Sequence, residues 1–448
     1  MAVLPAVRAY LVRRLAGVLR GWRGMPKLDA TKEVDPRYFR YSTIAKHGWV
    51  LYVTRLTQAG RWFLWPTLLW AGYSGTSLDL QMYIPFCYAI SMWGVALVAA
   101  WWFKPQAELR VHRAERIRAG MTLAIDAEVT PAGKRASTDW YLSAHRLPAA
   151  LDATEPEGLP LAVRAPGDSQ RVRLGLVASK RGAYRLPAWR VETDFPFGLM
   201  RAYRVYPDER PLLVYPRFRA LSRMDLPVGR RYQPGGVALA SHIGDSMEYK
   251  GNREYREGDN VRNIDWRATA RLGMPIVREY REEFFFRVGL ILDTHVPALA
   301  PESRHEAFEQ SVALSAAVSD YLSRKDYLVD LFAAGPNLYH LMAGRSLAYL
   351  EQILDILACV ESSPDEPFEI LEPALAAHLE QLSTVICVLM DWDERRRSFV
   401  YGLAGQGSAV KVIIVRQGPC TLDPAGEGRA LGEIVVLAPE DVEMVEML

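Results

Sequence analysis

The sequence predicts a multidomain chain, with a transmembrane α-hairpin, then an antiparallel β-sandwich, then a doubly wound α/β domain. Two uncharged apolar runs lie back to back within residues 62–103. Short alternating runs separated by turn residues fill residues 104–218, and apolar strands alternate with helical patterns over residues 287–448. At 448 residues the chain is too long for a single core, which fits this division.

The first 61 residues form a basic segment. They hold 12 Lys or Arg against three acidic residues and carry +9, so the other 387 residues of this +2 chain carry −7. We expect the segment to contact anionic inner-membrane lipid. A nucleic-acid-binding protein is not expected, because its positive charge would be spread over its fold. Residues 4–22 fit either an amphipathic helix on the inner leaflet or a flexible basic arm.

Membrane spans are predicted at residues 62–78 and 83–103, which are 17 and 21 residues long. A bilayer core of about 30 Å needs about 20 helical residues, so the second run spans easily and the first is just long enough. The short link between them has no Lys or Arg, whereas basic residues flank both outer ends. The positive-inside rule then predicts a two-pass inner-membrane protein with both termini in the cytoplasm. The alternative is a buried helical pair in a soluble core.

The β-sandwich is predicted at residues 104–218, where runs such as "RVRLGLVAS" and "PLLVYPRF" are separated by Gly, Pro, Asp and Ser. Residues 192–200, "ETDFPFGLM", predict a proline-containing corner between strands. Neither a carboxylate pair nor a nucleophile–histidine pair stands out in this sequence. We therefore expect a spacer domain without a catalytic site.

Residues 219–286 contain the most highly charged stretch, "REYREGDNVRNIDWRATAR" at residues 253–271, with five arginines and four acidic residues. Asp259 is a predicted N-cap, followed by a helix over residues 260–272 that Gly273 ends. One hypothesis is a charged cleft whose arginines hold an anion or a partner's carboxylate. The other is an ion-pair lattice that attaches the segment to the last domain, and the near balance of charge favours it. The residues concerned are Arg253, Arg262, Arg267 and Arg271 with Glu254, Glu257, Asp259 and Asp265.

Residues 287–448 predict an α/β domain. The strands "RVGLILD", "YLVDLFAA", "TVICVLMD" and "AVKVIIV" alternate with helical runs, which is typical of a doubly wound sheet. Ligands of such sheets bind at the carboxyl ends of strands, here near Asp293 and Asp391. The four cysteines and eight histidines show no disulfide or zinc spacing, and no phosphate-binding loop is present, so no cofactor is expected.

The charged stretch resembles a known family, the bacterial domain-of-unknown-function family fifty-eight. "KRGAYRL" (180–186), "DFPFGLMR" (194–201) and "VYPR" (214–217) resemble that family's lead-in motifs in the same order, so the resemblance runs from about residue 62 to the C-terminus. It implies a von Willebrand factor A-like last domain and a MoxR-type AAA+ ATPase as a partner, with no established reaction. The matching residues are Arg253, Glu254, Tyr255, Gly258, Asp259, Arg262, Ile264, Asp265, Trp266, Ala270 and Arg271.

The resemblance also implies a divalent metal site, because von Willebrand A domains hold such an ion with an Asp-x-Ser-x-Ser loop. Here the loop reads "DTHVP", with Asp293 followed by His295 and Pro297 at the serine positions. Proline offers no side-chain ligand and histidine suits Mg²⁺ poorly, so the site is degenerate and a divalent metal is not expected. Asp391 and Asp393 remain possible carboxylate donors. The alternative role of Asp293 is a strand-end cap for nearby amides.

Three functions follow from these patterns. The first is a non-enzymatic, membrane-anchored adaptor or scaffold that works with the ATPase in assembling or remodelling protein complexes. The second is a hydrolase that uses Asp259, Asp265, Asp293 and Asp391, provided the fold brings them together. The third is a metal-dependent binding protein. We favour the adaptor because no nucleophile stands beside a base in the charged stretch. The sequence does not specify an oligomeric state.

Overall fold

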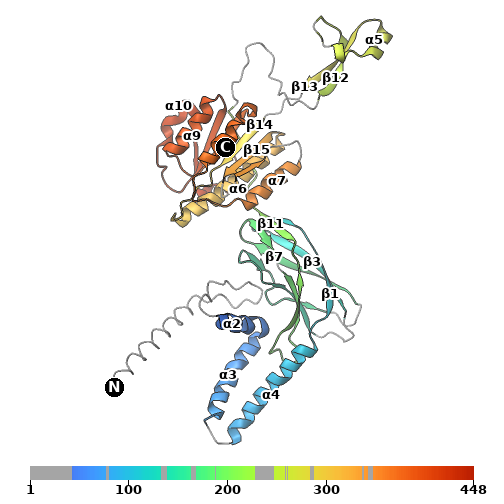
Figure 1. Cartoon of the computed structure of the whole chain (residues 1–448), viewed down its shortest axis with the longest axis vertical. Helices are drawn as coiled ribbons and strands as arrows, with labels where there is room; N and C mark the ends of the chain where they lie inside the picture. Colours follow the sequence, from blue (N-terminus) through green and yellow to red (C-terminus); the bar gives the residue numbers. More distant parts are fainter. Residues whose placement is uncertain are drawn as a thin grey trace. The chain divides into compact units, whose positions relative to one another are not determined.

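The computed structural model describes residues 43–76, 80–132, 139–162, 168–186, 188–227, 247–257, 259, 261–282, 287–334, 338–341 and 347–448 (Figure 1). The basic segment predicted at residues 1–61 therefore lies mostly outside the described residues, including the pattern at residues 4–22. The chain divides into two compact units, Met1–Tyr215 and Pro216–Leu448. The predicted membrane spans and the β-sandwich belong to the first unit, and the charged segment and the α/β domain belong to the second.

The first unit begins with helices α2 (Thr43–Arg55), α3 (Gln58–Ser74) and α4 (Leu80–Trp102). Residues Tyr83–Trp102 of α4 are long and apolar enough to cross a membrane, and no other described helix meets the same criteria. The helix α3 has 17 residues, and Trp93 Nε1 on α4 donates a 3.4 Å hydrogen bond to Thr67 Oγ1 on α3. Within this chain the pair buries little of its apolar surface, since Leu69 and Trp101 are 76% and 77% exposed. A helical pair buried in a soluble core, the alternative from the sequence, does not fit this exposure.

The β-sandwich is built from eleven short strands in the described residues, and its core lies between the two four-stranded sheets. Val129, Leu142 and Val191 are fully buried there. Along β3, buried residues alternate with exposed or half-buried ones, as the period-two pattern predicts. One pairing, between β2 and β11, is parallel, unlike the all-antiparallel sandwich predicted from the sequence. The first sheet has the order β1 (Ala107–Arg113), β3 (Thr122–Pro131), β7 (Gln170–Ala178), β5 (Leu151–Ala153); the second β10 (Ala202–Pro207), β9 (Ala188–Thr193), β4 (Trp140–His145), β6 (Leu159–Leu161); the third β2 (Arg116–Arg118), β11 (Pro211–Tyr215), β8 (Gly182–Arg185).

The start of α3 is joined to the corner that the sequence predicted at residues 192–200. The N-cap Thr57 donates its backbone N–H to Leu199 O at 3.2 Å, and its side chain accepts from Gly60 N at 2.9 Å. A Cβ at Gly60 would lie only 1.9 Å from Leu199 O, so only glycine permits this approach. Phe103, just after α4, contacts Phe195 of the same corner with ring centroids 5.0 Å apart. Both ends of the helical hairpin therefore meet one corner of the sandwich.

The second unit contains a small hairpin and the α/β domain (Figure 1). The strands β12 (Met247–Glu254) and β13 (Ile276–Glu282) pair antiparallel and enclose the 3₁₀ turn η2 (Val261–Asn263) and the helix α5 (Trp266–Leu272). We refer to residues 247–282 as the hairpin module. The next strand along the chain, β14 (Arg287–Leu292), belongs to the sheet of the α/β domain, and β13 pairs with β12 in a sheet of its own.

The α/β domain has a six-stranded sheet in which the third strand along the chain, β16, lies antiparallel at one edge and the other strands are parallel. In chain order the strands are arranged 3-2-1-4-5-6, the order of a doubly wound sheet, as predicted. The strands run in the order β16 (Leu338–Leu341), β15 (Leu328–Ala334), β14, β17 (Thr384–Leu389), β18 (Ala409–Val415), β19 (Val435–Leu437).

Helices cover both faces of this sheet. Ile291, Cys387 and Ile414 pack in one cluster with apolar residues of α8 and α9. Their strand neighbours point to the opposite face, and α6 contacts β14, β15, β17 and β18 there. This arrangement leaves the carboxyl ends of β14 and β17 as the edge where side chains from several elements converge. The helices are α6 (Glu302–Arg324), α7 (Leu347–Cys359), α8 (Phe368–Ala376), α9 (Glu394–Gly405) and α10 (Gly428–Leu431), with 3₁₀ turns η3 (Leu379–Gln381), η4 (Pro424–Glu427) and η5 (Pro439–Asp441).

Candidate functional site

Arg253 and Asp259 form a bidentate ion pair within the hairpin module. The guanidinium Nη1 and Nη2 atoms lie 2.6 and 2.7 Å from the two carboxylate oxygens, and Asp259 also accepts from Arg256 N at 2.8 Å. The hydrogen bond from Arg253, and then that from the Arg256 amide, lower the pKa of Asp259 to about 2. Asp259 therefore closes the turn after β12, and the prediction that it caps a helix over residues 260–272 is wrong.

Asp265 is the residue that caps the helix. Its Oδ1 accepts from Arg267 N at 3.1 Å and Ala268 N at 3.0 Å, and its Oδ2 accepts from Arg278 Nε on β13 at 3.2 Å. The Ala268 amide first, and the Arg278 guanidinium as a further cause, lower the pKa of this carboxyl. Gly273 ends the helix in the left-handed conformation with φ 70°, as predicted. Two acidic residues of the motif thus organise the module from within.

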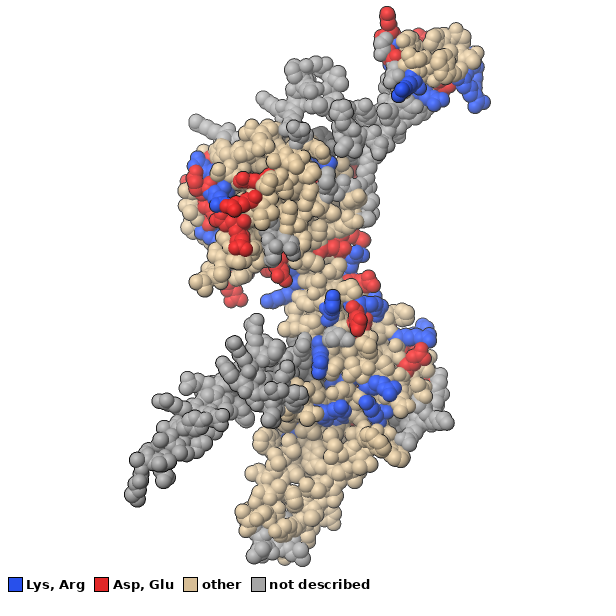
Figure 2. Space-filling model, viewed as in Figure 1, with Lys and Arg blue, Asp and Glu red and all other residues tan. Residues whose placement is uncertain are grey.

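Large apolar side chains are exposed between the end of β12 and the start of β13, on η2, on α5 and just after α5. Trp266 is 67% exposed, Val261 59%, Leu272 58% and Met274 42%. We call these four residues the apolar tip. Isolated exposed apolar residues are ordinary, but four of them on so small a module indicate a contact surface. Figure 2 shows the hairpin module, at the upper right, as a largely uncharged surface with Lys and Arg along its lower edges and Asp or Glu at its upper left.

Exposed arginines surround the apolar tip. Asp259 and Asp265 are already engaged by Arg253 and Arg278. The other charged side chains of residues 253–271 are exposed, with four arginines against two acids: Arg256, Arg262, Arg267 and Arg271 against Glu254 and Glu257. Among these, Arg262 has an interaction partner of its own. Two ion pairs, Arg253–Asp259 and Arg278–Asp265, therefore form within the hairpin module. The attachment of this segment to the last domain by such pairs stays a prediction.

Two further residues of the predicted motif are Tyr255 and Gly258. The backbone N–H of Tyr255 donates to Pro275 O at 2.9 Å, which extends the β12–β13 pairing by one bond, and its side chain is half-buried. Gly258 lies outside the described residues.

A second cluster lies at the carboxyl ends of β14 and β17, where the sequence predicted a ligand-binding edge. Asp293 is completely buried, and its Oδ1 accepts from His295 N at 3.0 Å. Its Oδ2 accepts from Met390 N at 3.1 Å and from Arg396 at 2.8 Å (Nε) and 2.7 Å (Nη2). Asp293 thus caps amides, as the strand-end alternative predicted, and it also pairs with an arginine 103 residues further along the chain.

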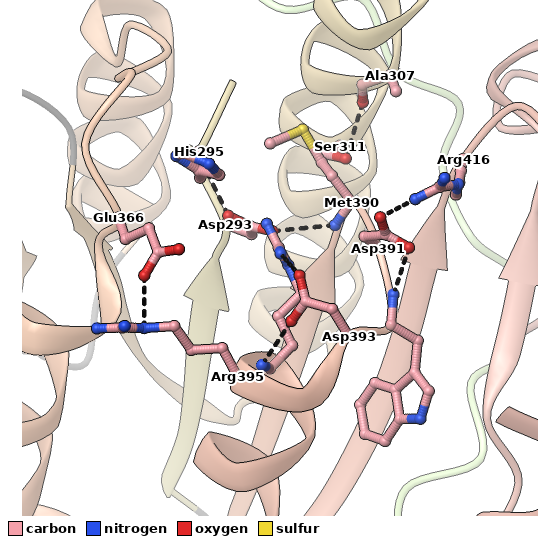
Figure 3. A network of polar contacts seen from close by, with 12 residues as sticks. Asp293, His295, Ala307, Ser311, Glu366, Met390, Asp391, Asp393, Arg395 and Arg416 are labelled. Carbon is pink, nitrogen blue, oxygen red and sulfur yellow. Dashed lines mark hydrogen bonds and ion pairs between the residues drawn. The ribbon is translucent and has the colours of Figure 1, made fainter. Parts of the chain in front are cut away.

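Asp391 and Asp393 hold arginines as well (Figure 3). Asp391 Oδ2 accepts from Arg304 Nη2 of α6 at 3.0 Å and from Thr421 Oγ1 at 2.9 Å, and it also pairs with Arg416. Asp393 is the N-cap of α9, accepting from Arg396 N at 2.9 Å, and its other oxygen pairs with the Arg396 guanidinium. We call these six charged residues, Asp293, Asp391, Asp393, Arg304, Arg396 and Arg416, the strand-end cluster.

The donor set of the strand-end cluster does not suit a divalent cation. Such an ion takes six or more oxygen ligands, whereas the groups directed at Asp293 are the backbone N–H groups of His295 and Met390 and the Arg396 guanidinium. His295 contributes its backbone, and its ring Nδ1 is buried without a hydrogen-bond partner. No group of three or more His, Cys, Asp or Glu suited to a metal occurs in the part of the chain that the structure describes.

Sequence reasoning missed the arginines of the strand-end cluster. Arg396 carried a signal, because it stands three residues after the N-cap Asp393, where its amide and its side chain both reach that carboxylate. Arg304 and Arg416 carried none, since they reach Asp391 from α6 and from the end of β18.

Most of the hairpin module lies in a stretch of the chain that is similar to a protein family. Residues 251–382 match the family described as "Protein of unknown function DUF58". Over 140 residues the chain is 26% identical to the "Uncharacterized protein YeaD" of Bacillus subtilis (strain 168), covering 31% of this chain and 32% of that protein. The chain thus spans about a third of the length of this curated relative. These matches confirm the predicted resemblance over residues 251–382, a shorter stretch than the one predicted from about residue 62 to the C-terminus.

Proposed function

We propose that this protein is a membrane-anchored adaptor whose cytoplasmic domains work with a MoxR-type AAA+ ATPase in assembling or remodelling protein complexes. The ATPase partner comes from the family resemblance. The structural support comes from the helical anchor, from the state of the carboxylates, and above all from the apolar tip with its exposed arginines. We infer further that the last domain is von Willebrand A-like, which its 3-2-1-4-5-6 strand order supports.

The anchor is supported by the helical hairpin of the first unit. Residues Tyr83–Trp102 of α4 could span a bilayer by length and composition. Apolar side chains that would be costly in water, such as Leu69, Tyr88 and Val98, are exposed along both helices. Figure 2 shows a surface without charge along this pair. We propose that both helices cross the inner membrane, with the two termini in the cytoplasm.

A binding role is favoured over a hydrolytic role because the carboxylates considered for acid–base catalysis are all engaged. Asp259 and Asp265 organise the hairpin module, and Asp293 and Asp391 pair with buried or half-buried arginines. These contacts occupy the carboxylate oxygens, whereas a general acid or base must have an oxygen within hydrogen-bond reach of its substrate. The metal-dependent alternative is not favoured, because the carboxylates of the strand-end cluster pair with arginines.

The observation that carries the proposal is the apolar tip. An indole exposed to 67% beside several guanidinium groups is the composition of a protein-binding hot spot, in which Trp and Arg are the commonest anchors. The surplus of exposed arginines is complementary to an acidic surface. We therefore propose that the hairpin module docks on an acidic, partly apolar surface of the ATPase.

Co-purification tests this proposal. The tagged full chain is purified in detergent from its own cells after mild cross-linking, with ATP, ADP or no nucleotide, and bound proteins are identified by mass spectrometry. We expect an AAA+ ATPase to be recovered with the wild type. Replacing a hot-spot anchor costs about 2 kcal/mol, so Trp266→Ala combined with Leu272→Ser should lower recovery at least about tenfold.

The matched control is Leu299→Ser, which changes a 99% exposed leucine of the α/β domain. Its recovery of the ATPase should equal that of the wild type. The absence of any AAA+ ATPase under all three nucleotide conditions would overturn the adaptor proposal. If the control and the tip variant lost the same amount of recovered ATPase, the hairpin module would not be the docking site.

A further inference from the structure

Asp293 holds a guanidinium where the fold family would hold a metal ion. Two Arg396 nitrogens lie 2.8 and 2.7 Å from Asp293 Oδ2, and a third pairs with Asp393. The Arg396 side chain is only 6% exposed, and its Cζ atom lies 5.5 Å from the centroid of the Phe368 ring. Two carboxylates and one aromatic face thus enclose a single positive charge.

The charges of the strand-end cluster balance. Three carboxylates, Asp293, Asp391 and Asp393, face three guanidiniums. Burial acts to lower the pKa of Arg396, but the two carboxylates outweigh it and the pKa is raised. Adding a divalent cation would place two further charges beside buried guanidiniums, which is costly in a region of low dielectric.

We infer that Arg396 is the resident cation of the strand-end site, so that this domain keeps its strand-end loops in place without a divalent ion. Arg396 lies in the first turn of α9, three residues after the N-cap Asp393. It therefore cannot dissociate as an ion can, and chelators or metal depletion do not change the site. This inference does not depend on the proposed ATPase partner.

Metal binding by the wild type provides the first test. The full chain in detergent is titrated with Mn²⁺ and followed by electron paramagnetic resonance and by its melting temperature, with Asp393→Asn as the comparison. We expect no stoichiometric uptake, and the same Tm with Mn²⁺ and with EDTA. Uptake of one Mn²⁺ per chain that Asp393→Asn abolishes would overturn the inference.

Chemical rescue provides the second test. Arg396→Gly leaves Asp293 buried without its partner, and we expect the Tm of the α/β domain to fall by on the order of 10 °C. Low millimolar guanidinium should restore several degrees in this variant, whereas the same concentration of NaCl should not. The wild type, measured in parallel, should gain nothing from guanidinium. If the Tm of Arg396→Gly fell as expected but was restored by Mn²⁺ and not by guanidinium, the inference would be contradicted.

A conservative variant keeps the test decisive if Arg396→Gly does not accumulate as folded protein. Arg396→Lys retains the charge but loses the fork that meets Asp293 and Asp393 together. We expect a lower Tm than the wild type that neither EDTA nor Mn²⁺ alters. A Tm equal to the wild type, or one that Mn²⁺ raises, would show that the site does not require a guanidinium as its cation.

Discussion

The strand-end cluster and the hairpin module use arginine in opposite ways. In the cluster, the Arg396 side chain is 6% exposed and meets a carboxylate that is fully buried. In the module, Arg253 and Arg278 meet carboxylates that are 18% and 17% exposed, and further arginines stand in solvent. The first arrangement is neutral and closed, whereas the second leaves positive charge around an apolar tip.

The comparison shows that density of charged residues does not by itself identify a binding surface. A buried pair organises the backbone around it and presents little to a partner. An exposed arginine beside an exposed indole contributes little to stability and is available for contact. The two regions should therefore respond differently to substitution, and the following four expectations test that difference.

The largest effect is expected from Asp293→Ala, which removes the buried carboxylate oxygen that accepts from Arg396 Nε and Nη2. Breaking a buried pair costs about 3–5 kcal/mol. Hydrogen exchange of the β14 and β17 amides should become correspondingly faster, as measured by mass spectrometry of the full chain. The control Glu394→Ala removes an acid that meets Arg397 with its side chain 77% exposed, and exchange should stay unchanged. Equal protection in both variants would show that the buried pair does not organise the strands.

A smaller effect is expected from Asp265→Ala in the hairpin module. The substitution removes the N-cap of α5 together with the contact to Arg278. Loss of a cap should speed exchange of the α5 amides about fivefold. Asp265→Asn retains an oxygen that accepts from Arg267 and Ala268, so it should recover most of the protection. If Asn and Ala behaved alike, the contact to Arg278 would be the more important one.

Acid should weaken the Arg253–Asp259 pair only below about pH 4. The folded pKa of Asp259 is about 2, below the value of about 3.9 expected in an unfolded chain. A depressed folded pKa means that the stabilising contribution is present above the unfolded pKa and is lost as pH falls through the folded one. Carboxyl-carbon NMR of aspartate-labelled protein should show this titration, and Asp259→Asn should remove it. A midpoint near 3.9 would indicate that the pair is not formed in solution.

The smallest effect on stability is expected from Trp266→Ala. Because the side chain is largely exposed, the free energy of unfolding should change by no more than about 0.5 kcal/mol. Thermal unfolding followed by calorimetry measures it, with Trp392→Ala as the contrast, since Trp392 is fully buried in the α/β core. A large loss in Trp266→Ala would mean that the indole packs within the protein and that the apolar tip is not free for a partner.

The sequence predicted the elements whose signal is local. Strand β14 was predicted from "RVGLIL" because an uninterrupted apolar run of that length suits a strand buried on both faces. Gly273 was identified correctly as a helix end because only glycine takes the left-handed conformation at low cost. The alternation of strands and helices along residues 287–448 predicted an α/β sheet, whereas the order of its strands came only from the structure.

The sequence failed where two similar residues competed or where the partner is distant. Asp259 and Asp265 are both acceptable N-caps, and only the hydrogen bond from Asp265 N to Ile276 O places the helix start after the second one. The partner of Asp293 could not be predicted, because Arg396 stands in a run of three arginines and only the fold selects which of them turns inward.

The seating of α3 on the sandwich has a mechanical consequence. Thr57 and Gly60 fix the first turn of the helix to the backbone around Leu199, and Phe103 meets Phe195 where α4 ends. With two attachment points at a single corner, rotation about either one alone is blocked. The helical hairpin is consequently held to the sandwich at both of its ends, so that a sideways lean of the hairpin loads this corner of the sandwich.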